Sequence, residues 1–532
     1  MILTSLSVSD VIGIIVSIIL IYVAKFYFQY FTRTNPLPGS IPLPFVGNLL
    51  GIIHYGKGDF TVWYKILHER HGDIFETYIG GCRRIVIARP DYIEKIMSTS
   101  TQSTYTLRMG KTPAFDELGV SKIGLTFNTH VPNWKFNRQF FTKVILAPSF
   151  SKEVVNLIPT IYDELNEYWK EIGEDVPIDF SIWINKFTTE ITFQMVVGLR
   201  VNGLKSYFNS FVESSKKKFI EPNPIDKDME HFPQITNEGL EYLGFFLVVP
   251  AIIRHTLLKK KNDAAFENRK QTFDLLTKII NHRRKEIEQT SIHEELRYDM
   301  LTLLITTNTE RELIDQKSVE EEHSKPLTND QISQILLEAL SGGIDTSSNA
   351  LCTVVYYLAH YPEVLARLRQ ELDTIFGFEK DRKITMEDLS KMRYAEAIFY
   401  ECTRFVNPAK TLLRTSTTKD IIAGYEWPAN MLIEIYAEGI HMNPAYWKDP
   451  HKFNPDRFMK SEALKSKILT FGGGVRGCPG RKIALITIKL LIFLIYRNFD
   501  ITLVDMNVPM NLKYSFLNTC TELKIKVRPR MS

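Results

Sequence analysis

The sequence predicts a mainly α-helical protein with small β-sheets, placed behind an N-terminal transmembrane helix. Apolar residues recur at helical spacing along most of the 532 residues, in stretches separated by Pro and Gly. The β-branched runs, such as 84–88 and 523–527, are short and predict only small sheets. An uncharged apolar run extends from Val11 to Ala24, and mostly apolar flanks lengthen it toward the span of a bilayer.

The composition is that of a folded globular chain. Hydrophobic residues make up 44% and charged residues 24%, which excludes a disordered chain and a multi-span membrane protein. The net charge of +4 is too small for a chain of this size to indicate nucleic acid as a partner. Five scattered cysteines argue against a disulfide scaffold and fit a reducing compartment.

Residues 1–31 are predicted to anchor the chain in a membrane. Lys25 and neighbouring aromatic residues follow the apolar run, as they do at the interfacial ends of transmembrane helices. A cleaved signal peptide is the alternative, but Asp10 precedes the run and no small-residue cleavage site follows it. Positive charges after the run would keep the remaining chain in the cytosol. Residues 32–50 are rich in proline and predict a stiff hinge, and residues 51–532 would form the globular domain.

A long apolar segment in the middle of the chain, residues 331–361, predicts a buried helix that Asp330 would cap. Its centre carries Gly342, Gly343, Asp345 and several hydroxyl residues, all of which weaken a buried helix. Either a functional site or a tight helix crossing would explain these residues.

Cys478 stands apart from the other cysteines. It ends the loop Phe471–Gly480, which has five glycines in ten residues and directly precedes a long apolar helix. The helix N-terminus, Arg476 and Arg481 favour the thiolate form, which is the form that binds metal. No second Cys or His lies nearby in the sequence, so one thiolate beside a glycine-rich loop suits haem iron better than zinc. The remaining cysteines are interpreted as buried structural thiols: Cys82, Cys352, Cys402 and Cys520.

This loop resembles the haem-binding loop of the cytochrome P-450 family, whose pattern is Phe-x-x-Gly-x-Arg-x-Cys-x-Gly. Other segments resemble further signatures of the family, in the expected order: Trp134 to Arg138 (Trp-x-x-x-Arg), Gly342 to Ser347 (distal helix), Glu401 to Arg404 (Glu-x-x-Arg) and Phe453 to Phe458 (Pro-x-Arg-Phe). The anchor and hinge resemble those of microsomal eukaryotic members, the hinge loosely, with Leu37 and Ser40 where proline is usual.

The resemblance implies a single haem domain that binds haem b, with Cys478 as the iron ligand. Its further implied cofactor contacts are Trp134, Arg138, Gly343, Arg414, Phe471, Gly474, Arg476 and Gly480, with Trp134 and the three arginines at the propionates. Asp345 and Thr346 would form an acid–alcohol pair that delivers protons during oxygen activation. Glu401, Arg404 and Arg457 would form a buried ion network with a structural role.

The implied function is that of a monooxygenase, which inserts one atom of O₂ into a hydrophobic small molecule such as a sterol, fatty acid or xenobiotic. Electrons would come from an NADPH-dependent flavoprotein reductase or a cytochrome b5-type donor, because the chain has no flavin or nicotinamide motif. The protein would sit in the endoplasmic reticulum membrane, with its catalytic domain in the cytosol. By family position the substrate pocket would draw on residues 105–130, 200–255 and 409–413, on Leu340 and Gly343, and on the turn near Phe516 and Leu517.

Three alternatives stay open from the sequence. A haem-thiolate isomerase or dehydratase would need no reductase, and a membrane-bound haem sensor would need no acid–alcohol pair. The presence of Asp345 and Thr346 favours oxygen activation over both. The run 242–253 is either a segment that dips into the bilayer or a core helix broken at Pro250.

Overall fold

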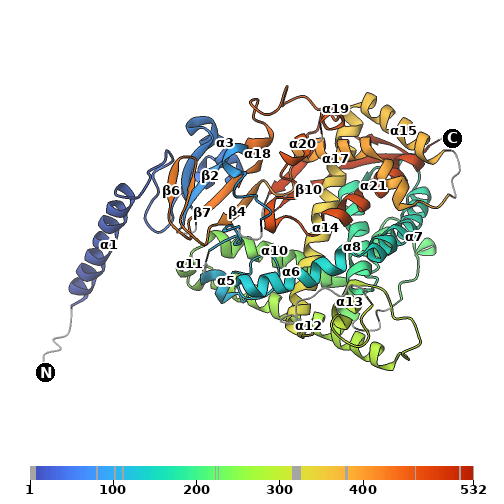
Figure 1. Ribbon diagram of the computed structural model, residues 1–532, viewed down its shortest axis with the longest axis horizontal. Helices are drawn as coiled ribbons and strands as arrows, with labels where there is room; N and C mark the ends of the chain where they lie inside the picture. Colours follow the sequence, from blue (N-terminus) through green and yellow to red (C-terminus); the bar gives the residue numbers. More distant parts are fainter. Residues whose placement is uncertain are drawn as a thin grey trace.

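The computed structural model confirms the predicted mainly helical fold with small sheets (Figure 1). The structure describes residues 7–79, 82–100, 103–110, 113–221, 223, 225, 227–313, 325–377, 382–461, 463–514 and 517–530. The helices of the first part of the chain are α1 (Val8–Phe31), α2 (Leu49–His54), α3 (Phe60–His71), α4 (Pro90–Ile93), α5 (Pro113–Glu117), α6 (Val131–Leu146), α7 (Pro148–Ile172), α8 (Phe180–Val197), α9 (Gly203–Asn209), α10 (Phe232–Val248), α11 (Ala251–His255), α12 (Lys259–Gln289) and α13 (Met300–Thr306). Those that follow are α14 (Asn329–His360), α15 (Pro362–Phe376), α16 (Met386–Lys391), α17 (Arg393–Phe405), α18 (Ala437–His441), α19 (Asp456–Lys460), α20 (Ala463–Ser466) and α21 (Arg481–Asn498). The described residues also include the 3₁₀ turns η1 (Ser214–Lys216), η2 (Lys227–His231) and η4 (Gly474–Arg476).

Four small sheets contain the strands of the described residues. The largest has the order β1-β2-β7-β4, in which β2 and β7 are parallel and the other neighbours antiparallel. The others pair β3 with β11 and β8, β5 with β6, and β9 with β10. The strands are β1 (Ile74–Ile79), β2 (Cys82–Ile87), β3 (Ile178–Asp179), β4 (Thr411–Thr415), β5 (Asp420–Ile422), β6 (Tyr425–Trp427), β7 (Leu432–Tyr436), β8 (Phe499–Leu503), β9 (Asn511–Tyr514), β10 (Asn518–Glu522) and β11 (Lys524–Pro529). The predicted strand segments thus lie in β2 and β11.

Helix α1 projects from the body of the protein and is exposed along nearly all of its length (Figure 1). A capping box between Ser7 and Asp10 begins it. Its mean hydropathy over an 18-residue window is 2.4, and it is the one described helix that is by itself long and apolar enough to cross a membrane. Its length and composition agree with the predicted anchor.

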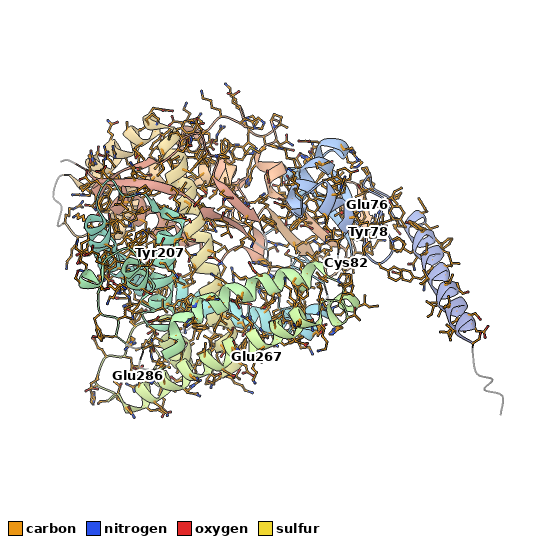
Figure 2. The ribbon with its side chains drawn as sticks, turned by 180° about the vertical axis from the view of Figure 1, so that it is seen from behind. Glu76, Tyr78, Cys82, Tyr207, Glu267 and Glu286 are labelled. Carbon is orange, nitrogen blue, oxygen red and sulfur yellow. The ribbon has the colours of Figure 1, made fainter. Side chains whose placement is uncertain are left out.

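The proline-rich segment after α1 lies against the edge of the largest sheet. Glu76 of β1 donates its backbone N–H to the carbonyl of Pro38 at 2.9 Å, and Gly39 forms an isolated bridge with the same residue. The Glu76 carboxylate is buried between the guanidinium groups of Arg33 and Arg83, each at 2.6 Å (Figure 2). The segment is therefore held to the domain by ion pairs and backbone bonds as well as stiffened by its prolines.

Helix α14 runs through the middle of the body, and most of its side chains are buried (Figure 1). The residue that caps it is Thr328, and the expected cap Asp330 lies in the first turn instead. Thr328 is extended, and its hydroxyl accepts the N–H of Gln331 while the Gln331 side chain accepts the N–H of Thr328. This reciprocal pair satisfies two donors, which the carboxylate of Asp330, two residues further along, could not do.

The centre of α14 crosses α8 at close range. A Cβ atom at Gly343 would lie 2.9 Å from the Cγ2 methyl of Thr192 on α8, whereas a Cβ atom at Gly342 would meet nothing within 4 Å. Thr192 is fixed because its hydroxyl donates to the carbonyl of Thr188 at 2.7 Å. One of the two glycines in this helix thus allows the tight crossing that the sequence left open.

We therefore expect the two glycines to respond differently to alanine. Both Gly342→Ala and Gly343→Ala gain helix propensity, but only the second overpacks the crossing, so it should be about 1–3 kcal/mol less stable than the first. Urea unfolding of the two variants measures this difference. Equal stabilities would show that α8 yields without cost.

Candidate active site

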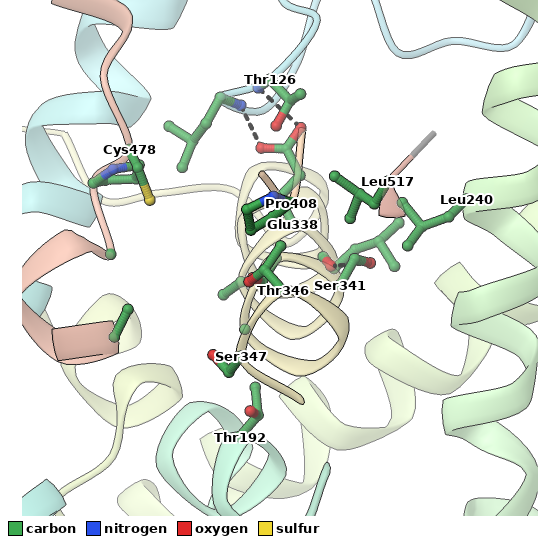
Figure 3. Close-up of a pocket in the computed structure, with 18 of the residues that line it drawn as sticks. Thr126, Thr192, Leu240, Glu338, Ser341, Thr346, Ser347, Pro408, Cys478 and Leu517 are labelled. Atoms are coloured by element: carbon green, nitrogen blue, oxygen red, sulfur yellow. Dashed lines mark hydrogen bonds between the residues drawn. The ribbon is translucent and has the colours of Figure 1, made fainter. Parts of the chain in front are cut away.

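A cavity of about 400 Å³ lies between α14 and the loop that carries Cys478 (Figure 3). Residues of helices α6, α8, α10 and α12, of the segment 118–127, of strand β4 and of the start of α21 also line it. Most of the lining side chains are apolar, including Leu118, Val120, Phe127, Ile191, Leu240 and Leu243. The cavity is thus suited to a hydrophobic guest.

The thiol of Cys478 opens onto this cavity from the end of its loop. The backbone N–H of Cys478 donates to the carbonyl of Phe471 at 2.8 Å, which closes the loop directly before α21. The pKa of the Cys478 thiol lies above its usual value, because burial outweighs the backbone N–H of Gly480, the charges of Arg108 and Arg138 and the backbone N–H of Arg481, which all lower it. Groups that favour the thiolate therefore surround the sulfur, and burial opposes them.

The glycines of the loop leave room for neighbouring backbone as well as for the cavity. Gly474 has a φ of +67°, and a Cβ atom there would lie 2.7 Å from the carbonyl oxygen of Ser98. Gly474 does not line the cavity, whereas Phe471 and Gly480 do. A Cβ atom at Gly480 would lie 3.8 Å from the Cys478 sulfur, in ordinary contact.

Three arginines from different elements hold the carbonyls of this loop. Arg138 of α6 donates to Gly477 at 2.8 Å, and Arg414 of β4 donates to Gly473 at 3.1 Å. Arg108 donates to the carbonyl of Arg476 at 3.4 Å. All of these arginines, and Arg476 itself, line the cavity.

The positive charges at this wall are not balanced by acidic partners. None of Arg108, Arg138, Arg414 and Arg476 forms an ion pair with a carboxylate in the part of the chain that the structure describes. Burial and then the charge of Arg108 lower the pKa of Arg414 to about 9, and burial followed by Arg108 and Arg414 lowers that of Arg476 to about 8. The wall therefore favours an anionic ligand.

Trp134 of α6 lies behind this wall and does not line the cavity. Its ring lies under the guanidinium of Arg476, 4.4 Å from ring centre to carbon. The indole N–H of Trp134 and the Nε atoms of Arg108 and Arg476 are buried and have no protein partner among the described residues. These donors are available to a ligand that enters between α6 and the Cys478 loop.

On the opposite wall, Thr346 faces the cavity and Asp345 does not (Figure 3). The hydroxyl of Thr346 donates to the carbonyl of Gly342 at 2.7 Å, one turn earlier in α14. The carboxylate of Asp345 accepts a hydrogen bond from Asn185 of α8 at 3.0 Å, and burial raises its pKa. The two residues are neighbours in sequence but point to different surroundings.

Glu401, Arg404 and Arg457 meet away from the cavity, in a fully hydrogen-bonded cluster. Both carboxylate oxygens of Glu401 accept from Arg404 at 2.9 Å, and one also accepts from Arg457 at 3.1 Å and from the N–H of Asn454 at 2.8 Å. The side chains of Glu401 and Arg404 are wholly buried, with 0% exposure each. This cluster ties the end of α17 to the segment before α19.

The family model named Cytochrome P450 matches residues 36–527. The chain belongs to the cytochrome P-450 family. It is 25% identical to cytochrome P-450 3A9 of Rattus norvegicus, over 92% of this chain and 90% of the relative. It is 24% identical to a lithocholate 6-beta-hydroxylase of Mesocricetus auratus, over 93% and 92% of the two chains. An isoflavone 2'-hydroxylase of Medicago truncatula is 25% identical, over 90% and 89%.

As a cytochrome P-450, the protein is a monooxygenase whose cofactor is haem b. The cavity fits that group, because a flat macrocycle with two carboxylates would supply the anions that the buried arginines and the Trp134 indole lack. A single thiol suits axial ligation, and the described residues contain no cluster of three His, Cys, Asp or Glu that could hold another metal.

The pocket residues that the sequence implied have different outcomes in this geometry. Gly343 lines the cavity, but its missing side chain makes room for Thr192, and Gly342 is the glycine that faces open space. Leu340 is buried in the core rather than at the cavity, because Leu337 and Ser341 occupy the cavity side of α14. Phe516 lies outside the described residues.

The cysteine interpretation needs one correction. Cys352, Cys402 and Cys520 are buried, as expected of structural thiols, but Cys82 is exposed. It begins β2 and pairs with Ile79, at the end of the hairpin where the chain passes from β1 to β2.

Two cavity residues carry no signal in the sequence motifs. Arg108 lies in an irregular segment and joins the other arginines only through the tertiary fold. Glu338 is a charged residue in an otherwise apolar part of α14, and its helical spacing from Gly342 and Thr346 was the one available sign that it faces the same side.

We expect Glu401→Gln to destabilise the protein by roughly 3–5 kcal/mol, because it leaves two buried guanidinium groups without their anion. The protein should lose haem as the fold weakens, which absorbance of the purified protein and urea unfolding would both report. The matched control is Glu387→Gln, which removes an exposed pair with Lys391 at 2.7 Å and should cost at most about 1 kcal/mol. Equal losses in the two variants would contradict a structural role for the buried cluster.

Proposed function

We propose that this cytochrome P-450 inserts one oxygen atom from O₂ into a hydrophobic small molecule, with Cys478 as the iron ligand. The observation that carries the proposal is the cavity itself, which sets one thiol and four unpaired guanidinium groups on one wall against apolar side chains and Thr346 on the others. Bound haem b supplies the oxygen-activating chemistry. The chain's own residues hold the cofactor, position the substrate, exclude water and move protons.

The cofactor-binding role is proposed for Arg138, Arg414, Arg476 and Trp134, and for Arg108, which the sequence motifs did not indicate. Each arginine already donates to a backbone carbonyl and retains further N–H groups, so it can bind a carboxylate without leaving its place. Phe471 and Gly480 lie at the cavity beside the sulfur and would limit water there.

Thr346 is proposed to deliver protons into the cavity, with Asp345 behind it. The Thr346 hydroxyl is held by the carbonyl of Gly342, and rotation of the hydroxyl would present it to a guest in the cavity. Burial raises the pKa of Asp345, so its carboxyl takes up a proton more readily than an exposed one would. Asn185 would steady the carboxylate between transfers.

The substrate is proposed to belong to the sterol, fatty acid or xenobiotic class. Apolar side chains from α8, α10 and the segment 118–127 line much of the cavity. Such a surface selects for hydrophobic shape and size rather than for a polar group. The names of the relatives, which include hydroxylases of lithocholate and of isoflavone, agree with a class of this kind.

The protein is proposed to sit in the endoplasmic reticulum membrane through α1, with its catalytic domain in the cytosol. Within the run 242–253, Phe245 and Phe246 are buried while Ile252 is 68% exposed, and Leu257 shortly after it is 83% exposed. The run is thus packed before Pro250 and open after it, and α11 lies on the same side of the body as α1 (Figure 1). These exposed side chains support a second contact with the bilayer at α11.

Electrons are proposed to come from an NADPH-dependent flavoprotein reductase or a cytochrome b5-type donor. Lys135 on α6 and Arg481 at the start of α21 are exposed, and both flank elements that carry the thiol or its arginines. An acidic surface on the donor would be attracted to them. Arg138, one turn from Lys135 on α6, is less suited to this role because its guanidinium donates to Gly477 inside the protein.

The reduced protein with bound carbon monoxide is expected to show the absorbance of thiolate-ligated haem. Cys478→His should replace it with the spectrum of imidazole-ligated haem, because Cys478 is the thiol at the cavity wall. Cys82→Ser, which changes an exposed thiol on β2, should keep the original spectrum. An imidazole-type spectrum in the unaltered protein would refute thiolate ligation.

Thr346→Ala is expected to lower product formation by on the order of 100-fold, while consumption of NADPH falls much less, because proton delivery is lost but electron supply is not. The assay uses purified protein, reductase, NADPH and a panel of lipophilic compounds. Ser341→Ala is the matched control, since this hydroxyl lines the same cavity and also donates to its own helix, at Leu337. Unchanged coupling of NADPH to product in Thr346→Ala would rule out the proton-delivery role.

A further inference from the structure

Glu338 is the one carboxylate among the described residues that line the cavity. It lies two turns before Thr346 on α14, and its oxygens accept three hydrogen bonds (Figure 3). The backbone N–H of Leu125 donates to one oxygen at 2.5 Å, and the N–H of Thr126 donates to the other at 3.2 Å. The side chain of Gln334 adds a third bond at 3.1 Å.

The same two backbone residues are bound from the opposite direction by the Cys478 loop. Arg476 donates to the carbonyl of Leu125 at 3.0 Å and to that of Thr126 at 3.2 Å. Each of the two residues therefore gives its N–H to Glu338 and its C=O to Arg476. This segment bridges the distal helix and the loop before the thiol.

The segment 124–126 lies close against Glu338. Gly124 precedes the bridge with a φ of +79°, and a Cβ atom there would lie 2.5 Å from a Glu338 carboxylate oxygen. Leu125, Thr126 and Phe127 all line the cavity, so the bridged segment is also part of the wall that a substrate meets.

We infer that Glu338 is a positioning residue: through the Leu125–Thr126 segment it fixes the guanidinium of Arg476 in the orientation that binds the anionic edge of the cofactor. Arg476 is buried and donates to the carbonyls of Leu125, Thr126 and Asn128, so the segment that Glu338 holds supplies two of the three acceptors that orient its remaining N–H groups. A carboxylate is required at position 338, because two N–H groups meet it and both need acceptors. This inference rests on the cofactor-binding role proposed for Arg476.

Glu338→Gln tests it with little change of volume. An amide offers one oxygen, so one backbone N–H would face an NH₂ group, and the segment should shift from its place. We expect haem to dissociate about 10-fold faster, measured by transfer to an excess of a haem-binding acceptor protein. The propionate bending band in resonance Raman spectra should shift in the same sense as in Arg476→Lys.

The double variant separates positioning from general loosening. If Glu338 acts through Arg476, Glu338→Gln combined with Arg476→Lys should dissociate haem little faster than Arg476→Lys alone. If the two substitutions instead multiplied each other's effect on the rate of haem dissociation, the inference would be overturned. Gln334→Met removes one donor to the same carboxylate. It should change the haem dissociation rate and the propionate band in the same direction as Glu338→Gln, but by a smaller amount. This variant replaces Glu338→Gln in the test if that protein does not fold.

The matched control is Glu371→Gln on α15. This carboxylate also accepts two consecutive backbone N–H groups, those of Tyr394 at 2.6 Å and Ala395 at 2.9 Å, but it does not line the cavity. It should lower thermal stability without a change in haem dissociation or in the propionate band. An equal change in Glu371→Gln would overturn the inference.

The failure of the proposed function has a different signature. If Arg476→Lys alone left haem dissociation and the propionate band unchanged, Arg476 would not bind the cofactor, and the inference would fall with that role. If Arg476→Lys sped dissociation but Glu338→Gln did not, only the role of Glu338 would be refuted.

Discussion

The constraint on which this structure depends is the burial of positive charge beside a thiol. Arg108, Arg138, Arg414 and Arg476 come from four separate segments and converge on the loop before α21, where most of their bonds go to backbone carbonyls. Carbonyls satisfy N–H groups but do not cancel charge, and burial lowers the pKa of each of these arginines. The arrangement is complete only with an anionic ligand, which is why the fold and the cofactor belong together.

A second cluster of buried arginines, around Glu401, contains its own carboxylate. Glu401 faces Arg404 and Arg457 with both oxygens, and the remaining guanidinium N–H groups find carbonyls such as that of Pro450. The Glu401 carboxylate supplies an anion within this cluster, and none of its three residues lines the cavity. Two clusters of buried arginines thus differ in role because one contains its anion and the other does not.

Helix α14 joins the parts of the site by presenting different residues to different neighbours. Gly343 admits α8, Thr346 faces the cavity, Asp345 points to Asn185, and Glu338 holds the segment that contacts Arg476. These contacts explain four of the residues that weaken it as an isolated helix. A helix in the centre of a large core can carry such residues because packing, rather than propensity, stabilises it.

The sequence by itself determined the long apolar helix at the N-terminus, the helical class and the thiol that faces the cavity, since these follow from uninterrupted hydropathy, spacing and a local motif around Cys478. It also indicated the residues of the Glu401 cluster and Thr346, because their motifs are short. Only the tertiary structure decided that Arg108 joins the cavity, that Glu338 bonds Leu125 and Thr126 from more than 200 positions away, and that Gly343 serves a helix crossing. Contacts between residues far apart in the chain depend on how the elements pack, and no local pattern of one sequence encodes them.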